Sequence, residues 1–202
     1  MIKEKLPFWG VLSSQIGRLF SHLPFRPNTY TWLTVLVAIF ALFAIIANKP
    51  NLGLGLFLLA GLLDIIDGGL ARHLGIASAS GAFLDGSLDR FVDFAVIFSY
   101  FWLPITTPWL SLGAWVAIAV FVAIMPSFEV AYANHRQAVD DPQEVKIWRI
   151  LNRGEMYPLM LAVILASNFS AVAAGWILVF WVILAAITTF QTLFIALKLA
   201  KS

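Results

Sequence analysis

Long apolar runs, separated by short polar segments, dominate this chain. A helix needs roughly 20 mainly apolar residues to cross the hydrocarbon core of a bilayer. The pattern predicts six spans, at residues 30–47, 52–72, 82–103, 108–133, 157–168 (extended toward the N-terminus) and 171–197. The fold class expected from this pattern is therefore an all-α integral membrane protein with six transmembrane helices.

The composition agrees with a membrane protein. Of the 202 residues, 61% are hydrophobic and 12% are charged, whereas soluble domains are about half apolar and about a quarter charged. So few charges cannot cover a water-facing surface, which excludes a soluble enzyme. The net charge of +2 is too small to indicate a nucleic-acid partner, and the absence of cysteine excludes disulfides and thiolate metal sites.

Basic residues fall almost entirely on one side of the predicted topology, and cytoplasmic loops are the ones that carry excess Lys and Arg. If the N-terminus is cytoplasmic, the outer side carries only Lys49. The inner side then carries Lys3, Lys5, Arg18, Arg26, Arg72, Arg136, Lys146, Arg149, Arg153, Lys198 and Lys201. An even number of spans places both termini in the cytoplasm.

Residues 1–28 differ from the rest of the chain. They contain no long apolar core and no small-residue cleavage site, so they do not indicate a cleavable signal peptide. Aromatic and aliphatic residues recur at helical spacing beside polar ones, which predicts an amphipathic helix lying in the membrane interface. Pro27 and Asn28 are expected in the turn before the first span. We therefore divide the chain into an N-terminal interfacial segment, 1–28, and a six-helix catalytic domain, 29–202.

Five aspartates interrupt the second and third predicted spans: Asp64, Asp67, Asp85, Asp89 and Asp93. A carboxylate inside a membrane is costly, so each indicates a functional site. The i, i+3 and i, i+4 spacings of the first four put each pair on one face of a helix. All-oxygen ligands suit Mg²⁺, Mn²⁺ or Ca²⁺, and four carboxylates could hold two ions. Asp93 is expected to pair with Arg90.

Small residues accompany these carboxylates. Gly68 and Ala71 lie on the Asp64 side of one helix, and Gly81 precedes the second pair of aspartates. Small side chains there leave room for a ligand or for a closely packed helix. Arg72 either anchors the helix at the interface or binds a phosphate through its two-pronged guanidinium group.

Residues 64–89 read D-I-I-D-G-G-L-A-R, then eight residues, then G-A-F-L-D-G-S-L-D. This run matches D-x2-D-G-x2-A-R-x8-G-x3-D-x3-D at every fixed position and resembles the signature of the CDP-alcohol phosphotransferases, also called the CDP-alcohol phosphatidyltransferase family. The six-span pattern and the interfacial helix are similar to that family too. The P-N-T-Y-T run at 27–31 is similar to the P-N-x-x-T that opens the family's first span.

The resemblance implies an enzyme that moves a phosphatidyl-type group from a CDP-linked lipid to a water-soluble alcohol and releases CMP. It implies two divalent cations, Mg²⁺ or Mn²⁺, held by Asp64, Asp67, Asp85 and Asp89, with Asp89 also the general base. It further implies that the CDP moiety is bound by Asn28, Gly68, Ala71, Arg72 and Gly81. A homodimer is expected on the same ground. The distribution of basic residues predicts that the active site faces the cytoplasm, at the inner membrane in a bacterium.

The acceptor alcohol is less clearly indicated. Family members that use inositol phosphate carry an S-Y-x-R-A-R-A-E-like run after the fourth span, whereas this chain has Val130 and Tyr132 where those arginines stand. Glycerol phosphate is therefore the leading expectation, with inositol phosphate, serine and other alcohols still open. The candidate acceptor-phosphate ligands are Arg136, Arg149 and Arg153. Glu129 is either a pocket residue or a paired structural group.

Two other classes of membrane protein also contain carboxylates within their spans. A cation transporter would explain the buried aspartates, but it does not explain the D-G-x2-A-R spacing. An intramembrane aspartyl protease needs paired aspartates, but the residues around Asp85 lack the G-x-G-D pattern that such proteases carry.

Overall fold

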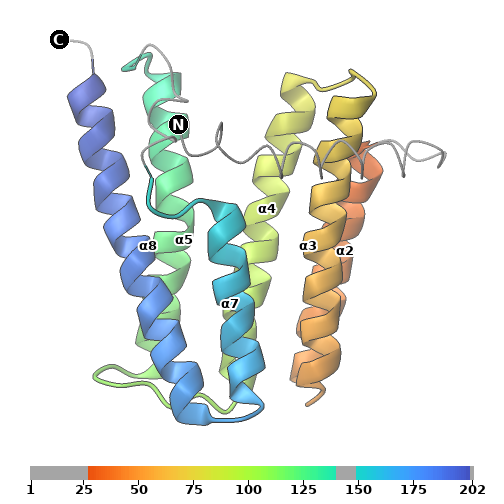
Figure 1. Cartoon of the computed structure of the whole chain (residues 1–202), viewed down its shortest axis with the longest axis vertical. Helices are drawn as coiled ribbons and strands as arrows, with labels where there is room; N and C mark the ends of the chain where they lie inside the picture. The colour runs from red at the N-terminus through yellow and green to blue at the C-terminus, as the bar shows by residue number, and fades with distance from the viewer. Residues whose placement is uncertain (1–26, 140–148, 201–202) are drawn as a thin grey trace. The chain divides into compact units, whose positions relative to one another are not determined.

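The computed structural model describes residues 27–139 and 149–200, and the chain divides into two compact units, 1–102 and 103–202. The described residues form α-helices and one short 3₁₀ helix, without a strand (Figure 1). The helices of the first unit are α2 (Pro27–Ile46), α3 (Pro50–His73), α4 (Ala79–Ser99) and the 3₁₀ helix Tyr100–Trp102. Those of the second unit are α5 (Leu112–His135), α7 (Arg153–Ser167) and α8 (Ala171–Leu199).

In the first unit, α2 packs against both α3 and α4. Tyr30 of α2 is buried in a cluster with Leu63, Ile66 and Leu70 of α3. The two helices approach closely at Gly53, where a Cβ atom would lie 2.9 Å from the Ala41 carbonyl oxygen. A glycine is therefore required at that crossing.

The chain reverses direction between α3 and α4 over residues 74–78. Gly75 adopts φ +65°, a left-handed conformation that glycine accepts without steric cost. Ile76 N donates a hydrogen bond to the Ala71 carbonyl oxygen at 3.1 Å. Ser78 then caps α4, since its Oγ accepts a hydrogen bond of 3.1 Å from Gly81 N. This tight reversal brings the end of α3 beside the start of α4, where the sequence motif lies.

In the second unit, α8 packs against both α5 and α7. Helix α5 begins at a Ser111 cap and contains Pro126. Helix α7 begins with a capping box in which Asn152 N donates to Glu155 Oε2 at 2.6 Å. At the other end of the unit, Thr106 N donates to the Ala171 carbonyl oxygen at 3.0 Å.

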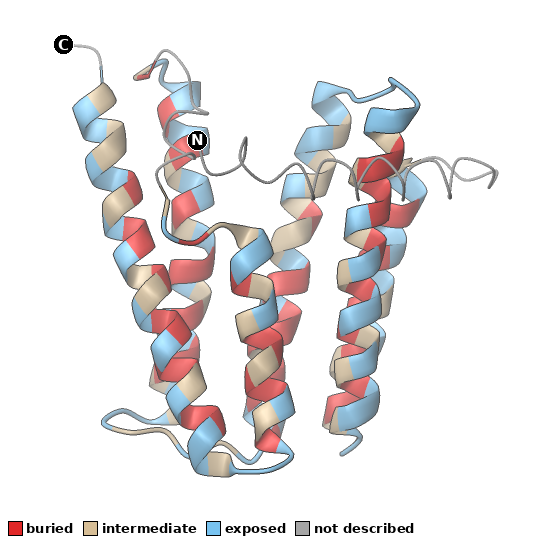
Figure 2. Ribbon diagram, in the orientation of Figure 1, coloured by how far each residue is buried: buried red, intermediate tan, exposed pale blue. Residues whose placement is uncertain are grey.

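Four of the described helices, α2, α3, α5 and α8, are long and apolar enough to cross a membrane. Buried and exposed residues alternate along the helices (Figure 2), and many exposed residues are large and apolar, such as Phe43 at 59% and Phe190 at 72% exposure. Such outward faces suit lipid rather than water, so the chain is an integral membrane protein.

The predicted count of six spans is only partly supported. Helix α4 has 21 residues but carries Asp85, Asp89, Arg90 and Asp93. Helix α7 has 15 residues, which rise about 22 Å along the axis. Six spans and cytoplasmic termini remain predictions. The interfacial helix predicted within residues 1–28 lies outside the described residues, apart from Pro27 and Asn28, which already belong to α2.

Candidate active site

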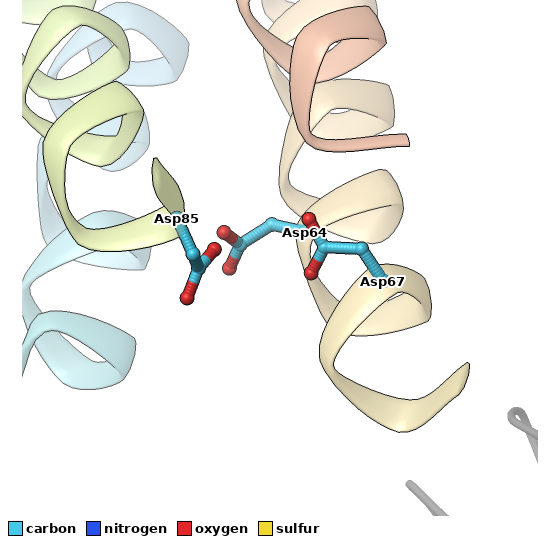
Figure 3. Close-up of side chains that lie close together, drawn as sticks. All are labelled: Asp64, Asp67 and Asp85. Carbon is cyan, nitrogen blue, oxygen red and sulfur yellow. The ribbon is translucent and has the colours of Figure 1, made fainter. Parts of the chain in front are cut away.

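Three of the predicted aspartates gather in the first unit. Asp64 and Asp67 extend from α3, and Asp85 extends toward them from α4 (Figure 3). One carboxylate oxygen from each residue lies within 4.8 Å of the other two. The i, i+3 spacing and the reversal at 74–78 are what bring the three side chains together.

The carboxylate cluster fits a divalent cation. Asp67 is 4% exposed, and its Oδ2 atom is buried without a hydrogen-bond partner among the described residues. The Thr31 side chain of α2 lies close to the same carboxyl group, while its Oγ1 donates a hydrogen bond of 3.3 Å to the Pro27 carbonyl oxygen. A buried anionic oxygen without a donor is costly, and two further carboxylates beside it add repulsion. A hard cation would relieve both costs, because oxygen ligands are the ones it prefers.

Asp89 lies one turn further along α4 and is half-buried. Among the described residues, it is not one of the three whose oxygens lie within 4.8 Å of one another. Another turn on, Asp93 is buried and forms an ion pair with Arg90, with 3.1 Å between Oδ2 and Nη2. The predicted Arg90–Asp93 pair is therefore confirmed.

A cavity of about 290 Å³ adjoins the cluster within the same unit. All five residues expected to bind CDP line it, together with two of the clustered carboxylates. The complete lining is Pro27, Asn28, Thr31, Asp67, Gly68, Ala71, Arg72, Ile76, Ala77, Ser78, Gly81, Ala82 and Asp85. The motif residues between Asp67 and Asp85 thus share one concave surface with the start of α2.

The two motif glycines keep this cavity open. A Cβ atom on Gly68 would lie 3.4 Å from Arg72 Nη1 and 3.5 Å from Nη2. A Cβ atom on Gly81 would lie 3.1 Å from Ser78 Oγ and 3.7 Å from Asn28 Oδ1. Each glycine therefore leaves space directly beside polar groups of the cavity wall.

Sequence reasoning missed several lining residues, of which Thr31 and Ser78 are polar. Thr31 was visible as the last position of the P-N-x-x-T run, one turn after Pro27. Ser78 was visible as a helix cap three residues before Gly81. Ile76, Ala77 and Ala82 carry no sequence signal that distinguishes them from other small or apolar residues.

The three candidate acceptor arginines lie in the second unit. Arg136 is exposed and follows the last residue of α5. Arg149 is half-buried and donates a hydrogen bond to the Pro126 carbonyl oxygen. Arg153 is half-buried in the first turn of α7, with its guanidinium carbon 5.9 Å from the centre of the Tyr157 ring.

The two positions at which the sequence departs from the inositol-phosphate pattern have different surroundings. Val130 is 5% exposed and packs with Ala133 and Val139 against the last turns of α8. Tyr132 is exposed, and its ring stacks on Phe128 with 5.6 Å between the ring centres. The side chain at position 130 therefore contributes to the packing of α5 against α8.

Carboxylates able to hold a hard cation, beside a cavity lined by an arginine, are suited to binding and transferring a phosphate group. The family model for CDP-alcohol phosphatidyltransferase matches residues 25–197. This chain belongs to the CDP-alcohol phosphatidyltransferase family, and it is a transferase of substituted phosphate groups.

Similar proteins agree with this assignment. The chain is 31% identical over 186 residues to the archaetidylinositol phosphate synthase of Pyrococcus horikoshii, over 91% of this chain and 90% of that protein. Its fold is similar to crystal structures of Mycobacterium tuberculosis phosphatidylinositol phosphate synthase (PgsA1). The structure with CDP-DAG bound has a TM-score of 0.73 and 21% identity, over 94% of this chain and 95% of that one. The structure with manganese and citrate has the same TM-score and identity, over 94% and 90%.

Proposed function

We propose that this enzyme transfers a phosphatidyl-type group from a CDP-linked lipid, CDP-diacylglycerol or CDP-archaeol, to a water-soluble alcohol and releases CMP. The observation that carries the proposal is the cavity in which Asn28, Gly68, Ala71, Arg72 and Gly81 lie beside the aspartate cluster. This part of the protein combines the guanidinium group of Arg72, open space beside Gly68 and Gly81, and carboxylates suited to a hard cation.

Asp64, Asp67 and Asp85, completed by Asp89, would hold two divalent cations, Mg²⁺ or Mn²⁺. When bound, such ions neutralise a diphosphate and stabilise the charge that develops on a departing phosphate. The buried, unpartnered Oδ2 of Asp67 and the 4.8 Å grouping of the first three residues support this assignment.

The residues of the cavity would bind the CDP moiety. Arg72 can donate two parallel N–H bonds to diphosphate oxygens, which is the geometry that guanidinium groups favour. Gly68 lets the guanidinium group lie along the helix surface, since no Cβ atom intervenes. Asn28 Oδ1 and Ser78 Oγ, on either side of Gly81, offer polar partners to the nucleoside.

Asp89 would act as the general base. The acceptor hydroxyl oxygen forms a bond to the lipid-side phosphorus while the bond from that phosphorus to the oxygen of CMP breaks. The hydroxyl proton passes to the Asp89 carboxylate, and CMP leaves with the bonding electrons. We propose direct transfer without a covalent enzyme intermediate.

For the acceptor we propose inositol phosphate. The name of the Pyrococcus relative, which aligns along most of both chains, supports this choice. The glycerol phosphate expected from the sequence rested on Val130 and Tyr132, and it gains no support from that relative. Because Val130 is buried in helix packing, the acceptor phosphate would be bound by the cationic side chains of Arg136, Arg149 and Arg153 instead.

We further propose that the active site faces the cytoplasm, because the cluster adjoins the end of α3 that carries Arg72 and His73 and basic residues favour that side. In a bacterium, the membrane would be the inner one. A homodimer is proposed from the family resemblance.

The deciding experiment measures CMP release by the purified full chain with Mn²⁺ or Mg²⁺ and a CDP-linked lipid. Inositol phosphate, glycerol phosphate, serine and inositol are compared as acceptors. We expect CMP release with inositol phosphate and its loss on chelation. Faster turnover with glycerol phosphate would overturn the proposed acceptor, and failure with every CDP-linked lipid would overturn the proposed donor. Cation transport into liposomes without any CDP-lipid consumption would instead favour a transporter.

A further inference from the structure

Two short segments meet at the end of the second unit where α5 and α8 begin. Residues 103–111 lead into α5, and residues 168–170 join α7 to α8. Thr106 N donates a hydrogen bond of 3.0 Å to the Ala171 carbonyl oxygen, and a Cβ atom on Gly175 would collide with the Thr106 carbonyl oxygen. The first segment therefore packs directly on the first turns of α8.

A strained turn at Trp109 projects from the first segment. Leu110 N donates to the Pro108 carbonyl oxygen at 2.7 Å, and Trp109 between them has φ +62°. A γ-turn of this hand is rare and strained, and a bulky residue at positive φ must be held there by its surroundings. Trp115 Nε1 donates to the Pro108 carbonyl oxygen at 2.9 Å. Thr107 Oγ1 donates to the Leu110 carbonyl oxygen at 2.9 Å, so both flanks of Trp109 are fixed.

The turn presents Trp109 beside a second exposed tryptophan. The Trp109 side chain is 75% exposed and lies edge-to-face against Trp176 of α8, with 5.4 Å between the ring centres. Leu110, Phe169 and Val172 are exposed on the same segments and at the start of α8. We call these five residues the aromatic tip. No charged residue occurs within 103–111 or 167–176, so the aromatic tip is poorly suited to water.

The aromatic tip continues the outward apolar surface of two membrane helices. Helices α5 and α8 are each long and apolar enough to cross a membrane, and both begin at the aromatic tip. Further along them, Phe121 of α5 and Phe180 of α8 are exposed as well. The aromatic tip therefore lies where these helices enter the bilayer. Tryptophan is enriched at that depth because its ring is apolar and its indole N–H is polar.

The absence of charge also restricts how the aromatic tip can bind lipid. Basic segments are attracted to anionic headgroups, but neither segment of the tip carries Lys or Arg. Binding must then come from insertion of the rings, which removes apolar surface from water, together with hydrogen bonds from indole N–H groups.

We propose that the aromatic tip is a lipid anchor that inserts into the glycerol region of the bilayer leaflet at this end of the second unit. Trp109 and Trp176 place their rings among the upper parts of the lipid chains and donate their indole N–H groups to lipid oxygen atoms. The strained turn holds Trp109 outward for this contact, and insertion fixes the depth at which α5 and α8 begin. This role is independent of the proposed reaction.

The test places spin labels at the aromatic tip of the full chain in liposomes. Because the chain contains no cysteine, Leu110→Cys and, separately, Phe169→Cys each carry a single label. Oxygen concentrates in the bilayer and a nickel chelate stays in water, so the ratio of the label's accessibility to the two reports depth. We expect this ratio to be several-fold higher at both positions than at His135→Cys, which is exposed at the other end of α5. It should be lower than at Phe190→Cys, which is exposed within α8.

The contribution of Trp109 is measured with the label at Leu110→Cys. Trp109→Ala should lower the ratio toward the value of His135→Cys, and Trp109→Phe, which keeps a ring without the N–H group, should lower it less. Both variants retain the turn, because its hydrogen bonds do not use the Trp109 side chain. Trp32→Ala removes an exposed tryptophan of α2 and is the matched control, which should leave the ratio unchanged.

Three results would overturn the proposal. If both labels are as accessible to the nickel chelate as His135→Cys, the aromatic tip lies in water. If both are shielded from oxygen and nickel alike, and dipolar coupling shows two labels close together, a second copy of the chain covers the tip. If Trp109→Ala leaves the ratio unchanged, the indole does not anchor the tip. Thermal unfolding of each labelled variant checks its folding, and the two label positions provide independent measurements.

Discussion

The guanidinium group of Arg72 lies against Gly68, one turn earlier on α3, so closely that a Cβ atom on Gly68 would lie 3.4 Å from Arg72 Nη1. Because Gly68 has no side chain, the guanidinium group of Arg72 can pack against the backbone there, at the edge of the cavity. This packing explains in physical terms why the two residues occur in one motif. A methyl group at 68 would touch the guanidinium group and compete with a diphosphate for its N–H groups.

Gly68→Ala should therefore weaken donor binding while stabilising the helix. Replacing glycine by alanine inside a helix contributes up to about 1 kcal/mol of stability, and the flexible end of Arg72 can move aside. We expect a higher thermal unfolding temperature and a several-fold higher KM for the CDP-lipid. Gly55→Ala is the matched control, because a Cβ atom there meets nothing within 4 Å on the same helix. It should raise stability alone, and an unchanged KM in Gly68→Ala would contradict the role of this contact.

Arg72→Lys should lose most of the donor affinity even though it keeps the positive charge. A lysine ammonium group cannot make two parallel hydrogen bonds to one phosphate. Loss of a charge-assisted hydrogen bond costs about 1.5–3 kcal/mol, so kcat/KM for the CDP-lipid should fall roughly tenfold to a hundredfold. His73→Ala, at the exposed neighbouring position, should leave kcat/KM unchanged. Equal activity of Arg72→Lys and wild type would show that Arg72 is only an interfacial anchor.

Asp67→Asn should abolish metal binding without destabilising the folded protein. Removing the buried charge relieves repulsion from Asp64 and Asp85, so the metal-free variant should unfold at the same or a higher temperature than metal-free wild type. The stabilisation that Mn²⁺ gives to wild type by binding the folded state should be lost, and CMP release with it. The readout is the thermal unfolding temperature with Mn²⁺ and with a chelator. A Mn²⁺-induced shift of wild-type size in Asp67→Asn would argue against the cluster as the metal site.

Asp89→Asn tests the proposed general base, which is not one of the three clustered aspartates Asp64, Asp67 and Asp85. If Asp89 removes the proton from the acceptor, the variant should lose about a hundredfold or more in kcat. At saturating Mn²⁺, which compensates for the loss of one proposed metal ligand, its KM for the CDP-lipid should change little, since the cavity residues are untouched. Steady-state CMP release at saturating substrate gives kcat, and titration of the CDP-lipid gives KM. Full turnover by Asp89→Asn would rule out the proposed base.

Much of the first unit could be predicted from the sequence, because local rules determine it. Helical spacing put Asp64 and Asp67 on one face of a helix, and Asp85 and Asp89 on one face of the next. The structure accordingly brings Asp85 close to Asp64 and Asp67. The family resemblance, rather than spacing, singled out Asn28, Gly68, Ala71, Arg72 and Gly81, and these five residues line one cavity. The Arg90–Asp93 pair followed from the i, i+3 rule in the same way.

The second unit was less predictable, since its relevant contacts join residues far apart in the chain. No spacing rule indicates that Arg149 bonds to Pro126, or that Ile150 bonds to Gln191. The prediction of membrane spans from hydrophobicity is not supported for α4 and α7, which are not among the helices long and apolar enough to cross a membrane. Hydrophobicity favoured a span at 82–103, yet the four charged residues of α4 exclude it from the helices that composition alone assigns to the membrane.

The orientation of the chain can be tested directly because the sequence contains no cysteine. Single cysteines are introduced at three exposed positions: Asn51 at the start of α3, His73 at its end, and His135 at the end of α5. The positive-inside distribution predicts that a membrane-impermeant maleimide added to intact cells labels only Asn51→Cys. His73→Cys and His135→Cys should react only after permeabilisation, since each lies at a helix end that the positive-inside distribution assigns to the cytoplasm. Retained CMP release by each variant provides the control for folding, and labelling of His73→Cys in intact cells would place the active site on the outer face.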